Sequence, residues 1–174
     1  DRDRKTGKVF CVLYDIEQAR RIREYRFNDT PIGNGGVAQN GGWFLGLNYA
    51  RMTRLRPVTG YKGAWDWTKG IAHPKDDGLF KVDIGSGEKT LLVSFNRMAR
   101  ELEALGRDMK TSRLFINHSL SNREGDRIFF FARAGWSGQK GKRINHPFVT
   151  DIDSNSLHSN RIHIGGHPEW EYGQ

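Results

Sequence analysis

The stretch that decides the fold class runs from Leu114 to Ala134 and reads Leu-Phe-Ile-Asn-His-Ser-Leu-Ser-Asn-Arg-Glu-Gly-Asp-Arg-Ile-Phe-Phe-Phe-Ala-Arg-Ala. Its continuous apolar run from Ile128 to Phe131 is typical of a strand that is buried on both faces. The polar segment 122–126 contains a glycine and has the length of a hairpin connection. Because a single hairpin is marginally stable in water, we expect the chain to repeat this unit.

A second pattern recurs along the chain and supports such a repeat. Val82-Asp-Ile-Gly-Ser-Gly87 and Thr150-Asp-Ile-Asp-Ser-Asn155 share an Asp-Ile pair that is followed by turn-forming residues. Thr6-Gly-Lys8 is similar to Ser86-Gly-Glu88, at a somewhat larger separation along the chain. Units of four short strands with a period above about 40 residues are typical of β-propeller blades that carry insertions of different lengths.

We therefore predict an all-β chain made of four-stranded antiparallel propeller blades, with one short helix near 97–105. A propeller needs about four blades to close, so the chain is expected to be an incomplete ring from a longer protein. A two-sheet sandwich built from the same hairpins is the alternative. The expected units of this single propeller segment, 1–174, are the end of one blade at 8–14, a second blade at 34–95, a third at 114–164 and the start of a fourth at 167–174.

Three local expectations follow from the same patterns. The strand that begins at Trp43 is expected to run to Met52. Residues 53–77 are expected to form a long connection, and so long a connection in a compact domain is usually functional or specially packed. The charged segment 17–25 fits either a short helix or an exposed strand.

The charge balance is basic, because 28 Lys and Arg residues outnumber 20 Asp and Glu residues and give a net charge of +8. Such a surplus is either a solvated surface or a site for a polyanionic partner. Nucleic acid is not the expected polyanion, since the aromatic run 129–131, which would have to stack on bases, has the pattern of a buried strand.

Other composition features limit the setting of the protein. No run approaches 18 apolar residues, so we predict no transmembrane helix and no membrane partner. Cys11 is the only cysteine and is expected to be a small buried side chain. It does not distinguish a cytoplasmic from a periplasmic location.

The histidines form the first candidate site. His118 and His167 begin strands at matched positions of neighbouring predicted blades, and the first strand of a blade lines the central channel. His163 lies four residues before His167. Converging imidazoles can bind a divalent metal or act as a general base. The alternative is that each histidine is a polar residue at a strand end, hydrogen-bonded to the backbone.

Arginine and tryptophan residues form the second candidate site, which would bind the substrate. The arginine guanidinium matches a carboxylate in a bidentate geometry, and a tryptophan in a long connection can stack on a sugar ring. The alternative is that these residues form a solvated rim or fill gaps between blades. The predicted substrate-binding residues are Arg51, Arg54, Arg123 and Trp65.

Three segments resemble a known family. Asp77-Gly-Leu-Phe-Lys-Val-Asp-Ile-Gly-Ser-Gly-Glu88, Phe115-Ile-Asn-His118 and Gly166-His-Pro-Glu-Trp170 are similar to blades of the oligogalacturonate-lyase-like β-propellers, which share the blade pattern of Tol-Pal-type propellers. The resemblance implies a seven-bladed ring with a divalent metal, typically manganese. It carries the metal-ligand role to His118, His163 and His167, and it provides no counterpart of the family's glutamine ligand or of a catalytic base.

These observations predict a carbohydrate-active β-propeller with an acidic oligosaccharide or another polyanion as its partner. The most specific version of this predicted function is a metal-assisted lyase that acts by β-elimination. In that reaction the metal and arginine would stabilise the developing negative charge. The alternative is a non-catalytic propeller that serves as a scaffold for a protein or ligand, so the sequence leaves open whether the protein is an enzyme. Open strand edges also predict self-association.

Overall fold

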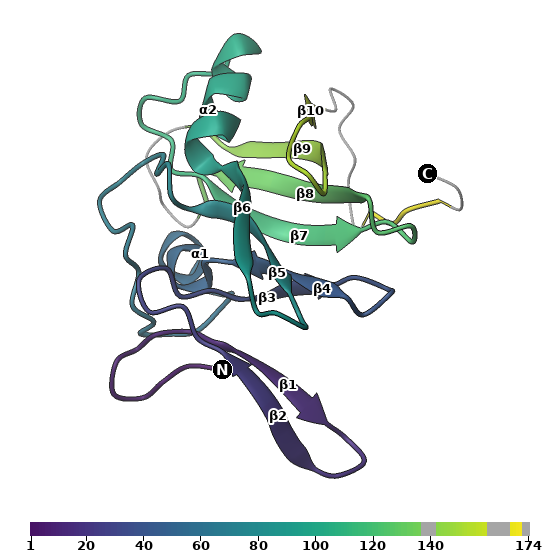
Figure 1. Ribbon diagram of the computed structural model, residues 1–174. Helices are drawn as coiled ribbons and strands as arrows, with labels where there is room; N and C mark the ends of the chain where they lie inside the picture. Colours follow the sequence, from purple (N-terminus) through teal and green to yellow (C-terminus); the bar gives the residue numbers. More distant parts are fainter. Residues whose placement is uncertain (137–141, 160–167, 172–174) are drawn as a thin grey trace.

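The computed structural model describes residues 1–136, 142–159 and 168–171, which are mostly β-structure (Figure 1). The strands and helices of this part follow one another along the chain with short turns alternating with longer connections. In order, they are β1 (Cys11–Asp15), β2 (Arg20–Tyr25), β3 (Gly33–Val37), β4 (Trp43–Leu47), α1 (Tyr49–Leu55), β5 (Gly78–Asp83), β6 (Lys89–Ser94), α2 (Phe95–Ala104), β7 (Phe115–Ser121), β8 (Arg127–Ala134), β9 (Ile144–Asp151) and β10 (Leu157–Ser159).

The strands form three antiparallel sheets. One is the β1–β2 hairpin, and the other two are four-stranded, in the orders β3-β4-β5-β6 and β10-β9-β8-β7. In both four-stranded sheets each strand pairs with the next one along the chain, so each sheet is a simple meander. Figure 1 shows the sheets following one another from the N-terminal hairpin to the C-terminal sheet. The prediction of an all-β chain is therefore confirmed.

The hairpin turns that follow β1, β5 and β9 repeat at a constant spacing. These strands end at Asp15, Asp83 and Asp151, which are equally spaced along the chain, and an isoleucine follows each aspartate. In the first two turns, the aspartate Oδ1 accepts a hydrogen bond from the backbone N–H three residues later. Gln18 N donates to Asp15 at 2.9 Å, and Ser86 N donates to Asp83 at 2.6 Å. Each turn contains a residue with a left-handed φ: 49° at Ala19, 81° at Gly87 and 58° at Ser154. The repeat predicted from the last two turns thus extends to the β1–β2 hairpin.

This register corrects the expected first unit. Residues 8–14 were expected to close a blade, but β1 is followed by a further strand, β2, so the ambiguous segment 17–25 is largely a strand. The similarity between Thr6-Gly-Lys8 and Ser86-Gly-Glu88 is a similarity of turns only. Gly7 N donates to Asp3 O as Gly87 N donates to Asp83 O, both at 2.9 Å, but the Asp3 turn precedes β1.

The strand expected from Trp43 to Met52 is wrong in its second half. β4 ends at Leu47, and α1 begins because Asn48 caps it: the Asn48 side chain accepts a hydrogen bond from Arg51 N at 2.9 Å. The helix predicted near 97–105 is confirmed as α2, which is capped by Ser94 and begins two residues earlier.

The third expected unit, 114–164, contains the sheet formed by β7 to β10, which ends at Ser159. Residues 160–167 and 172–174 lie outside the described residues, and with them half of the unit expected at 167–174. Residues 168–171 are described and carry no strand.

The core lies between neighbouring sheets. A large cluster that includes Leu45, Met98, Phe130 and Phe148 joins the two four-stranded sheets with both helices. A smaller cluster, Cys11, Tyr25, Ile32, Phe44, Phe80 and Val82, joins the β1–β2 hairpin to the sheet of β3 to β6. The apolar run 128–131 is buried as predicted. Cys11 is buried as well, and burial raises the pKa of its thiol to about 12.

The first strands of the two four-stranded sheets, β3 and β7, contact each other. Ser119 Oγ donates a hydrogen bond to Gly35 O at 2.7 Å, and a Cβ atom on Gly35 would lie 2.9 Å from that hydroxyl oxygen. Because the Leu47 side chain of β4 would also lie 2.8 Å from such a Cβ atom, this position favours glycine.

We expect Ser119→Ala to lower the free energy of unfolding by about 1 kcal/mol, because it leaves the partly buried Gly35 carbonyl without its donor. Urea denaturation would measure this change. Ser121→Ala in the same strand is the control and should change stability by less than half as much. Equal effects of the two substitutions would show that the contact between β3 and β7 does not contribute in this way.

The long connections leave the same end of the sheets (Figure 1). In a meander, alternate connections lie at opposite ends, so the short turns lie at one end. The described parts of the long connections, 26–32, 48–77, 95–114, 135–136 and 142–143, lie at the other end. The described parts of these connections carry 14 Lys and Arg residues and 7 Asp and Glu residues. Most of the positive surplus of the chain therefore belongs to the end with the long connections. Among the described residues, neither helix is long and apolar enough to cross a membrane.

Candidate functional site

A cavity of about 500 Å³ lies beside α1 at the end with the long connections. This volume is within the range of about 300–1,000 Å³ that is common for small-molecule sites. The cavity brings together two of the predicted substrate-binding residues, Arg54 and Trp65. Its lining consists of Ala50, Thr53, Arg54, Gly63, Ala64, Trp65, Asp66 and Lys69.

Asp66 fixes Arg54 at the wall of the cavity. Arg54 Nε lies 2.7 Å from Asp66 Oδ2, in an ion pair that is largely shielded from solvent. Asp66 Oδ1 accepts three further hydrogen bonds, from Asn48 Nδ2 and from the backbone and hydroxyl of Thr68. Burial alone would raise the pKa of Asp66, but the hydrogen bonds from Thr68 and Arg54 outweigh it and lower this pKa. Asp66 is thus an ionised carboxylate that is already occupied by protein donors.

Trp65 supplies an exposed aromatic surface. Its side chain is 42% exposed, and Lys8 Nζ lies 5.1 Å from the centre of the ring. Trp65 N donates to Gly7 O at 3.0 Å, which anchors the long connection to the turn before β1. Gly7 has a φ of +73°, and a Cβ atom there would lie 3.2 Å from Gly63 O, so this contact favours glycine. Together with the exposed Lys69, the cavity presents one indole and an excess of cationic groups.

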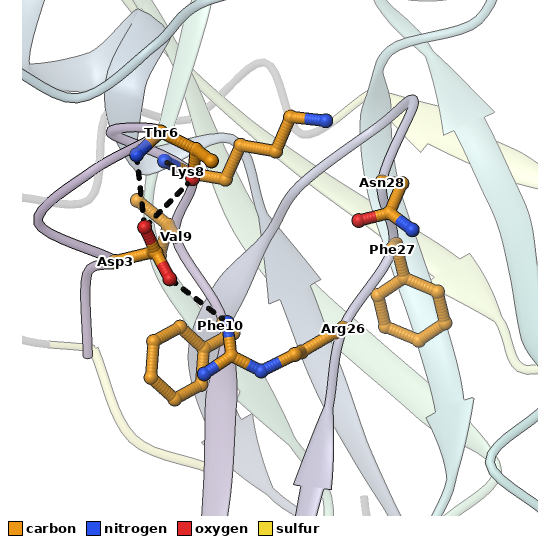
Figure 2. A pocket seen from close by; sticks show the side chains of 8 residues that line it. All are labelled: Asp3, Thr6, Lys8, Val9, Phe10, Arg26, Phe27 and Asn28. Carbon is orange, nitrogen blue, oxygen red and sulfur yellow. Dashed lines mark hydrogen bonds and ion pairs between the residues drawn. The ribbon is translucent and has the colours of Figure 1, made fainter.

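A smaller cavity of about 130 Å³ lies close to the turn before β1 (Figure 2). Two of its three charged side chains, Asp3 and Arg26, are paired with each other. Arg26 stacks on Phe10, with Cζ 3.6 Å from the ring centre, and Arg26 Nη1 lies 3.7 Å from Asp3 Oδ2. Figure 2 shows the Asp3 carboxylate between Thr6 and Arg26. Because of this pairing and the small volume, the larger cavity is the better candidate for a ligand site.

Arg51, a further predicted substrate-binding residue, is fully buried beneath the long connection. Its guanidinium donates to the carbonyl oxygens of Leu114, Ile71 and Ala72 and to the hydroxyl of Thr68, at 2.6 to 3.1 Å. Burial lowers the pKa of Arg51 to about 10. This arrangement gives Arg51 a structural role, and Arg51 does not line the cavity.

The remaining predicted residues lie away from the cavity or outside the described part. Arg123 lies in the exposed turn between β7 and β8, at the opposite end of the sheet. His118 lies in β7 at an irregularity of the pairing with β8, has a φ of 56°, and packs edge-to-face on Phe131 at 6.3 Å. His163 and His167 lie outside the described residues. The expected convergence of His118 and His167 therefore stays a prediction.

A metal site is not formed by the residues that the structure describes. Across 1–136, 142–159 and 168–171, no group of three or more His, Cys, Asp or Glu side chains is arranged to hold a metal ion. The divalent cation, with manganese as the expected ion, therefore stays a prediction.

Sequence reasoning missed a polar network beneath the cavity. Asn48 Nδ2 donates to both Asp66 and Asp77, at 3.1 and 2.8 Å. Asp77 is fully buried, and burial raises its pKa to about 7 despite the hydrogen bond from Asn48 and the charge of Arg51. The position of Asp66 between Trp65 and Trp67 was a possible signal. No pattern in the sequence indicated that Asn48 would meet Asp77, which lies at the far end of the same long connection.

Comparison with protein-family models, curated proteins and solved structures finds no match for this chain. The candidate site is therefore defined by its geometry alone, as a cavity with one exposed indole, an anchored guanidinium and one exposed lysine.

Proposed function

We propose that the chain is part of a β-propeller that binds an acidic oligosaccharide in the cavity of Arg54, Trp65 and Lys69. The propeller is supported by two four-stranded meanders whose first strands, β3 and β7, contact each other. The constant spacing of the Asp-Ile turns over three hairpins supports it as well.

The exposed indole of Trp65 beside cationic groups is the observation that carries the binding proposal. The apolar face of a sugar ring packs on an indole, while Lys69 attracts the carboxylate of a uronate. Asp66 does not oppose such a ligand strongly, since its charge is already paired with Arg54. The positive surplus of the long connections would also speed the approach of a polyanion.

We expect Trp65→Ala and Lys69→Gln each to weaken the binding of oligogalacturonate by about tenfold, a loss of about 1.4 kcal/mol for one stacking or charge contact. Isothermal titration calorimetry at low and at moderate salt would measure this change. The loss in Lys69→Gln should shrink as salt rises, because salt screens exposed charges. The loss in Trp65→Ala should change less with salt.

Lys62→Gln is the matched control, because Lys62 is an exposed lysine of the same connection that does not line the cavity. It should bind oligogalacturonate with nearly the original affinity. If all three substitutions weaken binding equally, attraction is diffuse and the cavity is not the site. If none does, the proposed function is wrong.

Cleavage by β-elimination is a separate proposal that needs more than this cavity. It requires a base and a cation at His118, His163 and His167, and it predicts a manganese-dependent unsaturated product from polygalacturonate. Loss of this product in His118→Ala would support the lyase form. Binding without product would favour the alternative, a non-catalytic propeller that presents a ligand site.

Self-association through strand edges is a further proposal. It would appear as a concentration-dependent mass in light scattering.

A further inference from the structure

Three guanidinium groups surround one tryptophan between the connections that follow β4 and β8. The Cζ atoms of Arg143, Arg56 and Arg133 lie 3.7, 4.9 and 5.5 Å from the ring centre of Trp136. Arg56 is the C-cap residue of α1, Arg133 lies near the end of β8, and Arg143 directly precedes β9. The cluster is therefore assembled by tertiary contact, and none of its residues lines the cavity at Trp65.

The cluster differs from ordinary arginine–aromatic packing in its charge. Among the ion pairs of the described residues, none involves Arg56, Arg133 or Arg143. Burial and the neighbouring charges of Arg56 and Arg143 lower the pKa of Arg133 to about 10. Within the described part of the chain, the three positive charges thus lie around one indole without an ion pair to a carboxylate.

Burial and one hydrogen bond fix the position of the Arg133 side chain. Its side chain is largely buried, and Arg133 Nε donates to Asn145 Oδ1 at 2.6 Å. Neither Asn145 nor the rings of Phe131 and Trp136 neutralise its charge. Arg143 is exposed and stacks closely on the indole, so a ligand can approach from its side. The cluster thus combines a fixed buried arginine, a half-buried one and an exposed one.

We propose that Arg56, Arg133 and Arg143, arranged around Trp136, form a binding site for an oxyanion. The ligand class is a group with two or three terminal oxygens, namely a carboxylate, a sulfate or a phosphate, because planar guanidinium groups pair with such oxygens in a bidentate manner. An anion there would also relieve the mutual repulsion of the three charges. This site does not depend on the proposed saccharide cavity. If both exist, the cluster is a second subsite for an acidic group.

Inorganic sulfate is the probe for this site. The protein is titrated with sodium sulfate while sodium chloride keeps the ionic strength constant, and tryptophan fluorescence is recorded. We expect a saturable change that Trp136→Phe removes, since the other tryptophans lie outside the cluster. Arg143→Gln should raise the Kd for sulfate by about tenfold, because it removes one charged hydrogen-bonding partner. Arg143→Lys should have a smaller effect, because it keeps the charge but not the planar fork.

Two controls carry the same change of charge. Arg127→Gln alters an exposed residue at the other end of β8, and Lys142→Gln alters the exposed neighbour of Arg143. Both should leave the Kd for sulfate within about twofold of the original value, since diffuse charge alone acts weakly at constant ionic strength. Equal effects of Arg143→Gln and the controls, or a response to sulfate no larger than to chloride, would overturn the proposal.

Competition then identifies the source of the oxyanion. Displacement of sulfate by oligogalacturonate would assign the site to a uronate carboxylate. Sulfate binding that oligogalacturonate does not disturb would assign it to a sulfate or phosphate group. Because Trp65→Ala and Lys69→Gln leave the cluster intact, a failure of the saccharide cavity and a failure of this site give different results.

Discussion

Arg51→Met is expected to lower the free energy of unfolding by about 4 kcal/mol, one of the two largest effects expected for this protein. Methionine keeps much of the length of the side chain but cannot donate to the carbonyl oxygens of Leu114, Ile71 and Ala72. Each buried acceptor that is left unpaired costs about 1–3 kcal/mol. Removing a buried charge offsets part of this loss. Urea denaturation followed by circular dichroism would measure the change.

Arg100→Met in α2 is the matched control, because Arg100 is exposed. It should change the free energy of unfolding by about 0.5 kcal/mol or less. A small effect of Arg51→Met, similar to that of the control, would contradict the role of Arg51 in holding residues 68–72 and Leu114 together. The comparison also separates the loss of a specific buried network from the loss of one positive charge.

The second large effect is a dependence of stability on pH that comes from Asp77. Its pKa is about 7 in the folded protein, above the ordinary value of 3.8, because the carboxyl is buried. Between these values the folded state binds more protons than the unfolded state, so the free energy of unfolding falls as pH rises from about 4 to 7. Above pH 7, the contribution of Asp77 to the free energy of unfolding is lower than at pH 4 by on the order of 4 kcal/mol.

Asp77→Asn tests this effect, since asparagine stays neutral at every pH. The variant loses one acceptor, because the two carboxylate oxygens of Asp77 accept from Asn48 and from Gly78 N. That cost is independent of pH. The difference in unfolding free energy, original protein minus variant, should therefore fall as pH rises from 4.5 to 8 in urea denaturation experiments. A difference that stays constant or rises with pH would show that Asp77 does not titrate as inferred.

Subtracting the unfolding free energy of Asp77→Asn from that of the original protein also removes the contribution of two histidines to the pH dependence. Burial lowers the pKa of His73 and of His146, so each favours folding more as pH rises through its range, opposite to Asp77. Both histidines are present in the original protein and in the variant. Their contribution therefore cancels when the two pH profiles are subtracted.

Local patterns predicted much of the fold because they act within a few residues. The Asp-Ile turns at Asp83 and Asp151 are closed by hydrogen bonds to the next residues, so the sequence alone indicates them. The same holds for α2, whose cap and apolar face are local. The apolar pattern predicted the wrong element after Asn48, where it indicated a continued strand instead of α1. The apolar residues after this asparagine fit a strand as well as a helix, and the structure begins α1 there, with Asn48 accepting the capping hydrogen bond from Arg51 N.

The candidate site could be predicted only in part. Arg54 and Trp65 were identified because a cationic and an aromatic residue in a long connection are typical of a binding site. Arg51 has the same residue type and lies three positions earlier, yet its partners are Leu114 and residues 68–72 rather than the cavity. Which arginine is buried depends on chain segments up to 63 residues away, and no local pattern contains that information.

The sequence by itself determined the all-β class, the recurrence of the Asp-Ile turns and the buried run at Ile128–Phe131, because hydrogen bonds within turns and alternation along strands are short-range. Only the tertiary structure decided that the long connections share one end, that Arg54 and Trp65 line one cavity, and that Arg56, Arg133 and Arg143 meet around Trp136. The physical reason is that these groupings depend on how separate strands pair and how separate sheets pack, and such contacts join residues distant in sequence.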